Sequence, residues 1–459
     1  MIQRFCAFRW IGVVASAALL GLMVVLVAAA DDAATPLRRY RLEVGQQIQY
    51  EGGGNDKYSD GTSSRTEGHW EFDVIGHCAD GNFRLLFRMT GVSTQIDLDG
   101  KEQRTDEPVT VAFVDMDTVG NITELFHSIG YRSNPAMDFP PLPADAKQLA
   151  DGWQSAGSLG STMHYRALPE SNSKEFVFSI EENTPFNAIY DSHNSRTITF
   201  DAERGLPIKY SSTDKWGYRV KSEGSGEYKL VDVQIHDADW AAKLKADAEQ
   251  YFLAKQQFNK ATENDEATAE SLDQAVASFK ESREKITSAD FQQQIDRELD
   301  DFQKYRSYQE ERNADRKSML GQAAEEFTTT DLDDKAQALA DYRGKVVLLD
   351  FWYRGCGWCI RSMPALKKVG EHYAGQPVAL LGMNTDRDLD DAKFVVDKLG
   401  LNYPNLKAEG LPTKFKVHGF PTMILIDQTG KIRDIHAGWT PTLEQDMIDK
   451  IDRLLAEAK

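Results

Sequence analysis

Two cysteines, Cys356 and Cys359, form the pattern in this chain with the clearest capacity for chemistry. They follow the apolar run 346–352, which predicts a buried strand, and a helix is predicted to begin directly after them. A C-x-x-C motif between a strand and a helix is typical of thiol–disulfide redox sites. Two intervening residues form a turn small enough for the two sulfurs to meet.

The predicted helix start gives the two thiols different roles. Cys356 would lie at the first turn, where unpaired backbone N–H groups and the helix dipole stabilise a thiolate. Cys359 would lie one turn further in and be less exposed. We therefore expect Cys356 to attack a partner disulfide and Cys359 to resolve the mixed disulfide that forms.

Three other uses of a cysteine pair fit the sequence less well. Zinc binding would need two further ligands at suitable spacing, and the chain has no second cysteine pair, so we expect no metal. A copper chaperone would be expected to space its cysteines by three residues. A peroxidase of the peroxiredoxin type would carry Thr or Ser three residues before the attacking cysteine, where this chain has Tyr353. The peroxidase remains a weaker alternative.

Strands and helices alternate from residue 321 onward, and these elements would position the cysteine pair. The predicted order is strand, helix, strand, helix, hairpin and final helix, which is typical of an α/β layer structure. The segments are 346–351, 364–373, 378–383, 388–399, 422–427 with 432–436, and 443–458.

The region from about Ala323 to the C-terminus resembles thioredoxin-like proteins of the TlpA/ResA type, the extracytoplasmic branch of that fold. The resemblance implies a thioredoxin fold and a thiol–disulfide oxidoreductase activity. It also implies a reductase that receives electrons from a membrane thiol carrier. The matching segments are 327–332, 342–348, Met363-Pro364 after the cysteines, and Gly419-Phe420-Pro421-Thr422 before the last hairpin.

The resemblance also assigns residues around the cysteines. Pro421 matches the cis-proline that faces the disulfide and helps to seat an extended partner. Asp350 stands where thioredoxin keeps a buried carboxylate. That acid is expected to help deprotonate the resolving cysteine, because burial raises its pKa toward neutrality. The alternative for Asp350 is an acid at a strand end that is only bonded to backbone.

Three positions near the site depart from the thioredoxin pattern. The bulky Phe420 precedes the proline, and we expect it to narrow or reshape the groove that binds the partner. Trp358 lies inside the motif and is expected to touch partners. Gly382 stands near the place of the lysine that accompanies the buried acid in thioredoxin, so that lysine is not matched here.

The N-terminus indicates export from the cytoplasm. Arg4 and Arg9 precede the uncharged segment 11–30, which ends abruptly at Asp31. A positive head and an apolar middle predict a secretory signal peptide over residues 1–30. Because about 20 apolar residues can also span a bilayer, an N-terminal membrane anchor is the alternative. Either would place the remainder in the periplasm or cell envelope.

The rest of the chain falls into two zones of different composition. Short apolar runs alternate with turn residues over 36–236, which predicts an antiparallel, mainly-β domain of unknown role. Over 237–320 glycine and proline are absent and apolar residues recur at helical spacing, which predicts a solvated α-helical spacer. A docking or dimerising surface is the alternative for this zone. With a thioredoxin-like domain at 321–459, we predict a multidomain chain.

Charge and motif together favour one function. The net charge of −19 disfavours unaided binding to nucleic acid. We predict an extracytoplasmic thiol–disulfide oxidoreductase that needs no cofactor, reduces disulfide-containing envelope proteins and receives electrons from a membrane thiol donor. The alternative is an envelope ligand- or protein-binding module, formed by the β-rich half, that carries an accessory redox domain.

Overall fold

The structure is a computed structural model, and it describes residues 37–78, 81–127, 139–156, 161–183, 185–262, 264 and 267–457. The predicted signal peptide or anchor at 1–30 lies outside these residues. Within the described part of the chain, no helix is both long enough and apolar enough to cross a membrane.

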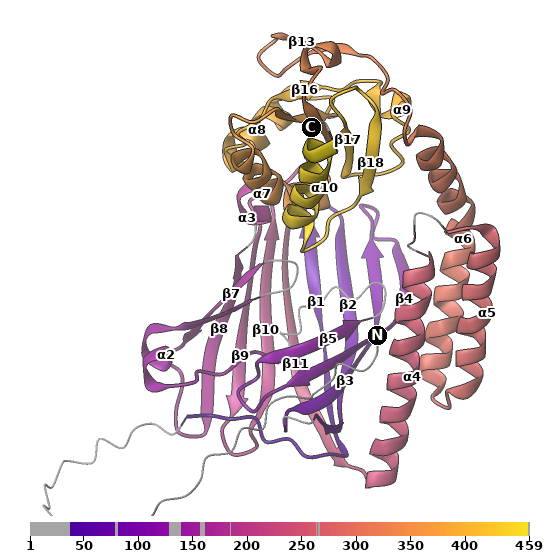
Figure 1. Cartoon of the computed structure of the whole chain (residues 1–459). Coiled ribbons are helices and arrows are strands. Elements are labelled where there is room, and N and C mark those ends of the chain that lie inside the picture. The colour runs from indigo at the N-terminus through magenta and orange to yellow at the C-terminus, as the bar shows by residue number, and fades with distance from the viewer. Residues whose placement is uncertain are drawn as a thin grey trace, which may run out of the picture.

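In the described part of the first half, eleven strands form one antiparallel, curved sheet (Figure 1). The strand order is β5-β4-β3-β2-β1-β11-β10-β9-β8-β7-β6, so neighbours in the sheet are neighbours in sequence except where β1 pairs with β11. The short helices α2 (Ala146–Asp151) and α3 (Pro185–Tyr190) lie between strands. The strands are β1 (Gln46–Tyr58), β2 (Ser63–His77), β3 (Phe83–Ile96), β4 (Glu102–Met116), β5 (Ile122–His127), β6 (Trp153–Ala156), β7 (Thr162–Ala167), β8 (Glu175–Asn183), β9 (His193–Asp201), β10 (Leu206–Trp216) and β11 (Ser222–Ile235).

Alternation along these strands places apolar side chains on one face of the sheet. Ile48 and Tyr50 of β1 lie opposite Phe72 and Trp70 of β2, and the ring of Tyr210 packs edge-on against Tyr50. All five side chains are buried in one large cluster. Side chains along a strand alternate between the two faces of the sheet. This register of β1 and β2 therefore places every second residue in the core. The predicted β domain is thus one curved sheet in its described part.

Helices cover part of the opposite face of the sheet. They are α4 (Ala238–Thr262), α5 (Ala269–Lys285) and α6 (Ala289–Met319). Phe252, Phe258 and Phe291 of these helices are buried in one cluster with Leu86 and Phe113 of the sheet. The prediction of a solvated spacer is therefore wrong. Helical periodicity reveals an apolar stripe, but it does not reveal that the stripe is buried against strands of another zone.

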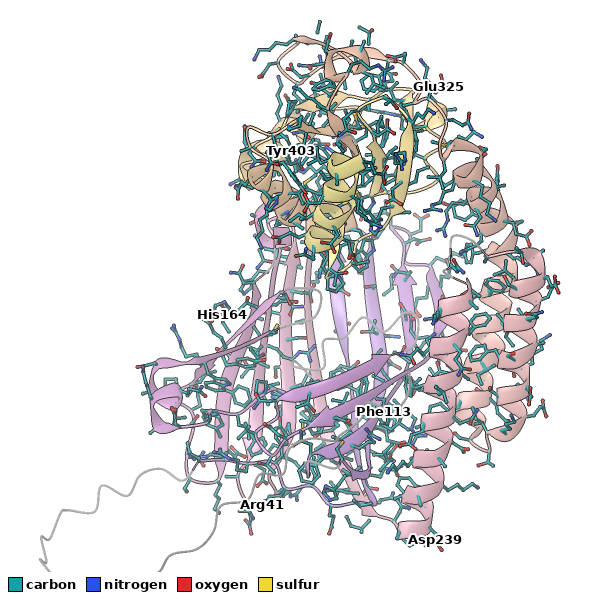
Figure 2. The ribbon with its side chains drawn as sticks, in the orientation of Figure 1. Arg41, Phe113, His164, Asp239, Glu325 and Tyr403 are labelled. Atoms are coloured by element: carbon teal, nitrogen blue, oxygen red, sulfur yellow. A yellow bond between two sulfur atoms is a disulfide. The ribbon has the colours of Figure 1, made fainter. Side chains whose placement is uncertain are left out.

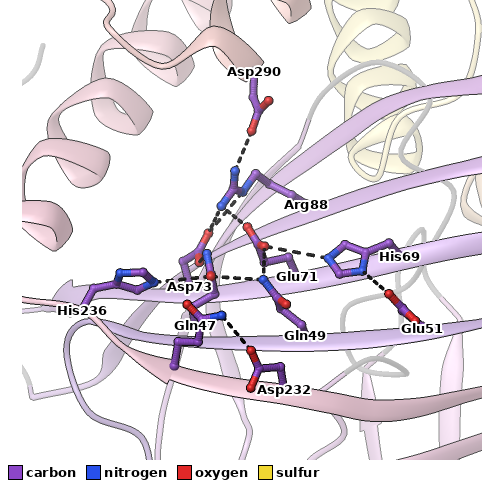
Figure 3. Close-up of polar contacts among 11 residues, drawn as sticks. Gln47, Gln49, Glu51, His69, Glu71, Asp73, Arg88, Asp232, His236 and Asp290 are labelled. Atoms are coloured by element: carbon purple, nitrogen blue, oxygen red, sulfur yellow. Dashed lines mark hydrogen bonds and ion pairs between the residues drawn. The ribbon is translucent and has the colours of Figure 1, made fainter.

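An ion cluster joins the sheet to the start of α6 (Figure 3). Arg88 of β3 donates hydrogen bonds to Asp73 of β2 (2.7 Å) and to Asp290 in the first turn of α6 (2.5 Å), and it also pairs with Glu71. Asp73 is completely buried, and burial raises its pKa to about 6 although the charge of Arg88 acts in the opposite direction. These contacts hold the helical layer on the sheet.

The last part of the chain folds as a mixed sheet with the order β16-β15-β14-β17-β18. Strand β14 runs parallel to β15 and antiparallel to β17, and helices flank both faces. We call this unit the redox domain; Figure 1 shows it at one end of the large sheet, beyond the end of α6. Its elements are β12 (Thr328–Thr330), β13 (Ala336–Ala338), a 3-10 turn (Leu339–Tyr342), β14 (Val346–Trp352), α7 (Gly357–His372), β15 (Val378–Asn384), α8 (Leu389–Leu399), β16 (Asn405–Lys407), α9 (Leu411–Lys414), β17 (Thr422–Ile426), β18 (Ile432–Ala437) and α10 (Leu443–Glu457).

The central strand of the redox domain is buried from end to end. Val346 and Leu348 pack with residues of α7 and α10 on one face. Val347, Leu349 and Phe351 are buried on the other face. A strand covered on both faces reads as a continuous apolar run, which is the pattern seen in the sequence.

Candidate active site

A disulfide between Cys356 and Cys359 lies at the start of α7. Cys356 caps the helix, and its sulfur accepts a hydrogen bond from the backbone N–H of Cys359 at 3.0 Å. The two Cα atoms are 5.2 Å apart. Cys356 keeps 5% of its surface exposed, whereas Cys359 is completely buried. Cys356 is thus the more accessible of the two cysteines, and it lies at the helix start, where negative charge on a sulfur is stabilised.

Pro421 lies at the end of β14 that leads into the disulfide. The next residue, Thr422, is paired with Phe351 in the sheet, which brings the loop before β17 to this end of β14. The peptide bond between Phe420 and Pro421 is cis. Phe420 packs against the apolar cluster that contains both cysteines, and its ring meets Tyr353 edge-on with centroids 5.2 Å apart. The loop at 420–421 and the cysteine pair thus share one site.

Trp358 forms a group with Trp439 and Arg361 that we call the aromatic patch. Trp358 is 49% exposed, and its ring lies nearly parallel to that of Trp439 with centroids 6.0 Å apart. The guanidinium of Arg361 lies over both rings, at 5.6 and 5.8 Å from their centroids. Sequence reasoning missed Trp439, because it follows the hairpin and no local motif links it to the cysteines.

Asp350 is completely buried within β14. Neither of its side-chain oxygens has a hydrogen-bond partner among the described residues, so the alternative of an acid bonded to backbone does not hold. Burial raises the pKa of Asp350 to about 7. Such a group can exchange a proton near neutral pH, as a general acid or base must.

A tyrosine, not a lysine, lies near Asp350. Gly382 is paired with Asp350 on β15, and a Cβ atom at Gly382 would collide with Oδ1 of Asn405. That oxygen accepts a hydrogen bond from Nε1 of Trp352 at 3.0 Å, so a larger side chain at position 382 would displace Asn405 and disturb this bond. Tyr403, labelled in Figure 2, is buried, and the charge of Asp350 adds to burial in raising the pKa of its hydroxyl. No motif in the sequence identifies Tyr403.

Helix α3, which lies between strands β8 and β9 of the large sheet, also packs near the disulfide. Ile189 and Tyr190 of α3 are buried in the same apolar cluster as Cys356 and Trp352. The Tyr190 hydroxyl donates a hydrogen bond to the backbone oxygen of Arg354 at 2.6 Å. Sequence reasoning missed this contact entirely, because pairings between distant segments leave no local pattern.

Carboxylates near the disulfide are held by hydrogen bonds rather than arranged as metal ligands. Asp386 accepts a hydrogen bond from the backbone N–H of Arg354 at 2.9 Å, and Asp391 accepts one from its guanidinium at 2.8 Å. Across the described residues, no group of three or more His, Cys, Asp or Glu side chains could hold a metal ion.

Known proteins match this chain in the redox domain. The sequence model of the Redoxin family matches residues 319–452. The thioredoxin-like protein YneN of Bacillus subtilis is 32% identical over 136 residues, which make up 29% of this chain and 78% of that protein. The thiol-disulfide oxidoreductase ResA of Geobacillus thermodenitrificans is 31% identical over 121 residues, which make up 26% of this chain and 70% of that protein.

A solved structure also matches the redox domain in part. A putative thiol:disulfide interchange protein DsbE from Chlorobium tepidum is 28% identical, and the match covers 30% of this chain and 97% of that chain with a TM-score of 0.29. The geometry of the cysteine pair agrees with the sequence relationship to the curated proteins. Through its redox domain, this chain belongs to the thioredoxin-like thiol–disulfide oxidoreductases of the ResA type.

Proposed function

We propose that this protein is an extracytoplasmic reductase of protein disulfides. The observation that carries the proposal is the disulfide between Cys356 and Cys359 at the start of α7, where Cys356 keeps 5% of its surface exposed and Cys359 is completely buried. The segment 1–30 supports the location, because it has the pattern of a secretory signal or an anchor. On this proposal the protein works in the periplasm or cell envelope, and its partners are disulfide-containing envelope proteins.

The first step joins the enzyme to its partner. The thiolate of reduced Cys356 attacks one sulfur of the partner disulfide, so that a bond forms between these two sulfurs and the partner's S–S bond breaks. The second partner sulfur leaves as a thiolate and takes up a proton. The unpaired N–H groups at the start of α7 favour the thiolate that begins this step.

The second step releases the partner. The thiol of Cys359 gives its proton to the carboxylate of Asp350, and the resulting thiolate attacks the sulfur of Cys356. The mixed disulfide breaks, the disulfide of the enzyme forms, and the released partner thiolate is protonated. In total, two thiols of the enzyme have become a disulfide and the partner disulfide has become two thiols. A membrane dithiol protein then reduces the enzyme and is itself oxidised to a disulfide.

The partner is proposed to bind between the loop at Pro421 and the aromatic patch. Phe420 packs against the cluster that contains Cys356, and Trp358 is half exposed in the first turn of α7. An extended segment that reaches the sulfur of Cys356 would contact aromatic surface at both places. Aromatic side chains bury much apolar area with little loss of rotamer freedom, so they suit a site that binds several partners.

The domain boundaries belong to the same proposal. We assign residues 1–30 to the signal or anchor, 36–236 to the β domain, 237–320 to the helical layer and 321–459 to the redox domain. Strands β1–β11, helices α4–α6 and elements β12–α10 fall within the last three ranges. Because α4–α6 pack on the sheet, the helical layer and the β domain share a core.

The test is a pair of cysteine variants of the full chain. Cys359→Ser should accumulate mixed disulfides between Cys356 and envelope proteins, because the resolving thiol is missing. Cys356→Ser is the matched control and should trap nothing. Covalent complexes are separated without reductant and identified by mass spectrometry. If both variants reduce insulin disulfides as fast as the unaltered protein, the proposal fails.

A further inference from the structure

One side of the disulfide is covered by the β domain. Helix α3 lies against α7 and α8 of the redox domain (Figure 1). Ile189 and Tyr190 of α3 are each 1% exposed, and both belong to the apolar cluster that contains Cys356. Contacts between segments this far apart in sequence must be built by the tertiary fold, and they place the β domain at the redox site.

Arg354, two residues before the attacking cysteine, is the centre of these contacts. Its backbone oxygen accepts the hydrogen bond from the Tyr190 hydroxyl at 2.6 Å, and its guanidinium donates to the backbone oxygen of Ile189 at 3.1 Å. The guanidinium also lies over the ring of Tyr218, 4.6 Å from the centroid. The turn that carries Cys356 is therefore tied to two segments of the β domain, α3 and the connection from β10 to β11.

Asp391 at the start of α8 completes the contact. It accepts hydrogen bonds from the guanidinium of Arg354 at 2.8 Å and from the hydroxyl of Tyr218 at 3.3 Å. Arg219 forms an ion pair with it at 3.4 Å. We call this group of five side chains the latch: Tyr190, Tyr218 and Arg219 of the β domain, with Arg354 and Asp391 of the redox domain.

The redox domain has a second attachment, through α6. Asp315 of α6 accepts hydrogen bonds from Lys416 at 2.7 Å and pairs with His418 at 2.9 Å. Opening the latch would therefore leave the redox domain attached at α6, so that it could swing away from α3 without separating. Relative motion is the default expectation for two domains unless their interface is large and hydrophobic.

From these contacts we infer that the latch is the selectivity element of the redox site: it holds α3 against one side of Cys356 and limits the size of the disulfide partner that the Cys356 sulfur can meet. This inference rests on the proposed reductase function and adds the substrate class to it. The favoured substrates are disulfides carried on extended or unfolded segments, and disulfides in folded, bulky partners are disfavoured.

The geometry of attack supports this substrate class. Cys356 is 5% exposed, while Tyr353 and Trp358 on either side of it in the sequence are 37% and 49% exposed, so the surface beside Cys356 that α3 does not cover is open to a partner. A thiolate must meet one particular sulfur of the disulfide, and the rate depends on access to it. An extended segment can enter beside α3, whereas a folded partner also needs the space that α3 occupies.

The test uses full-length Tyr190→Phe/Tyr218→Phe, which removes two latch hydroxyls and keeps both rings. Tyr305→Phe is the matched control, because Tyr305 is 67% exposed on α6. Each protein is assayed on folded insulin and on an unstructured peptide with one disulfide. Losing one hydrogen bond shifts an opening equilibrium about fivefold. The ratio of the insulin rate to the peptide rate should rise about fivefold or more in the double variant and stay constant in the control.

A second measurement needs no turnover. The reduced proteins are alkylated with a small maleimide and with a polyethylene-glycol maleimide, and modification is followed on the peptide that carries Cys356. The double variant should react faster with the large reagent relative to the small one. If the double variant folds poorly, Tyr190→Phe alone gives the same comparison.

The outcomes separate the two hypotheses. An unchanged insulin-to-peptide ratio, or an unchanged ratio of alkylation rates, would overturn the inference while leaving the reductase function intact. If the unaltered protein reduces neither insulin nor the peptide, the proposed function fails, and the alkylation rates still decide whether the latch limits access to Cys356.

Discussion

Replacing Asp350 by Asn removes one ionisable group from the interior of the redox domain and hardly changes its shape. Asp350 is completely buried, and its oxygens have no hydrogen-bond partner among the described residues. Asparagine has nearly the size of the protonated acid, so it should fit wherever that acid fits. The variant therefore isolates the free energy of ionising one carboxyl group inside the domain.

The sign and size of the effect follow from the raised pKa. Burial raises the pKa of Asp350 from 3.8 to about 7. Between these pH values the folded state keeps a proton that the unfolded state has lost, so the free energy of unfolding falls as pH rises from about 4 to about 7 and is level above that. The gap corresponds to about 4 kcal/mol. Asp350→Asn lacks this fall, so it should match the unaltered protein at pH 4 and exceed its stability by about 4 kcal/mol at pH 8.

Hydrogen exchange of the buried β14 amides measures this difference, because it reports the opening free energy of the redox domain alone. Oxidised proteins are compared at equal pH, so the intrinsic exchange rate cancels. Asp333→Asn is the matched control, since the Asp333 side chain is 75% exposed. A stability gain that is the same at pH 4 and pH 8 would refute the reasoning, because it would show that folding does not shift the pKa of Asp350.

The same substitution should slow catalysis while it stabilises the fold. In the proposed mechanism the ionised carboxylate of Asp350 accepts the proton of Cys359, so release of the partner from the mixed disulfide should accelerate as pH rises through about 7. Asp350→Asn should lose that acceleration in a single-turnover assay. A residue that only supports the structure would not combine greater stability at pH 8 with slower release.

Three further substitutions test the packing around the site. Arg88→Gln leaves the buried carboxylate of Asp73 without its guanidinium and should cost about 3 kcal/mol at pH 8, with a smaller loss at pH 5 in urea unfolding because Asp73 is then protonated. Phe291→Ala empties part of the core between helices and sheet and should cost about 3 to 5 kcal/mol in the same assay. Gly382→Ala places a Cβ against Asn405 and should cost about 1 to 3 kcal/mol, measured by exchange of the β14 amides.

The redox site could be predicted because local sequence patterns identify its central strand and its two cysteines. The strand before Cys356 is buried on both faces and reads as one apolar run, and the cysteine spacing fits a single turn at a helix start. Thr422 pairs with β14, so the motif at 419–422 also had to lie near the disulfide once the fold was assigned. The orphaned carboxyl of Asp350 could be placed by resemblance, but its pKa depends on complete burial, which only the packed structure supplies.

The parts that could not be predicted depend on pairings between distant segments. The stripe that carries Phe252 and Phe291 is visible as a helical period, but nothing in that period says that Phe113 of the sheet covers it. Tyr190 and Arg354 meet only because the large sheet and the redox domain are docked. Such contacts follow from topology, and neither residue type nor spacing marks them in advance.

The contacts on the two sides of the disulfide argue against a redox domain that is freely tethered to a separate binding module. On one side, the turn before Cys356 is held by Tyr190 of α3, which is part of the β domain. On the other side, His418, which precedes the loop at Pro421, is held by Asp315 of α6. Helix α6 is in turn fixed to the sheet at its first turn, where Arg88 binds Asp290. Both segments that flank the disulfide are thus anchored to one sheet through different elements, so displacing either anchor should change access to the attacking sulfur before it changes the fold of the redox domain.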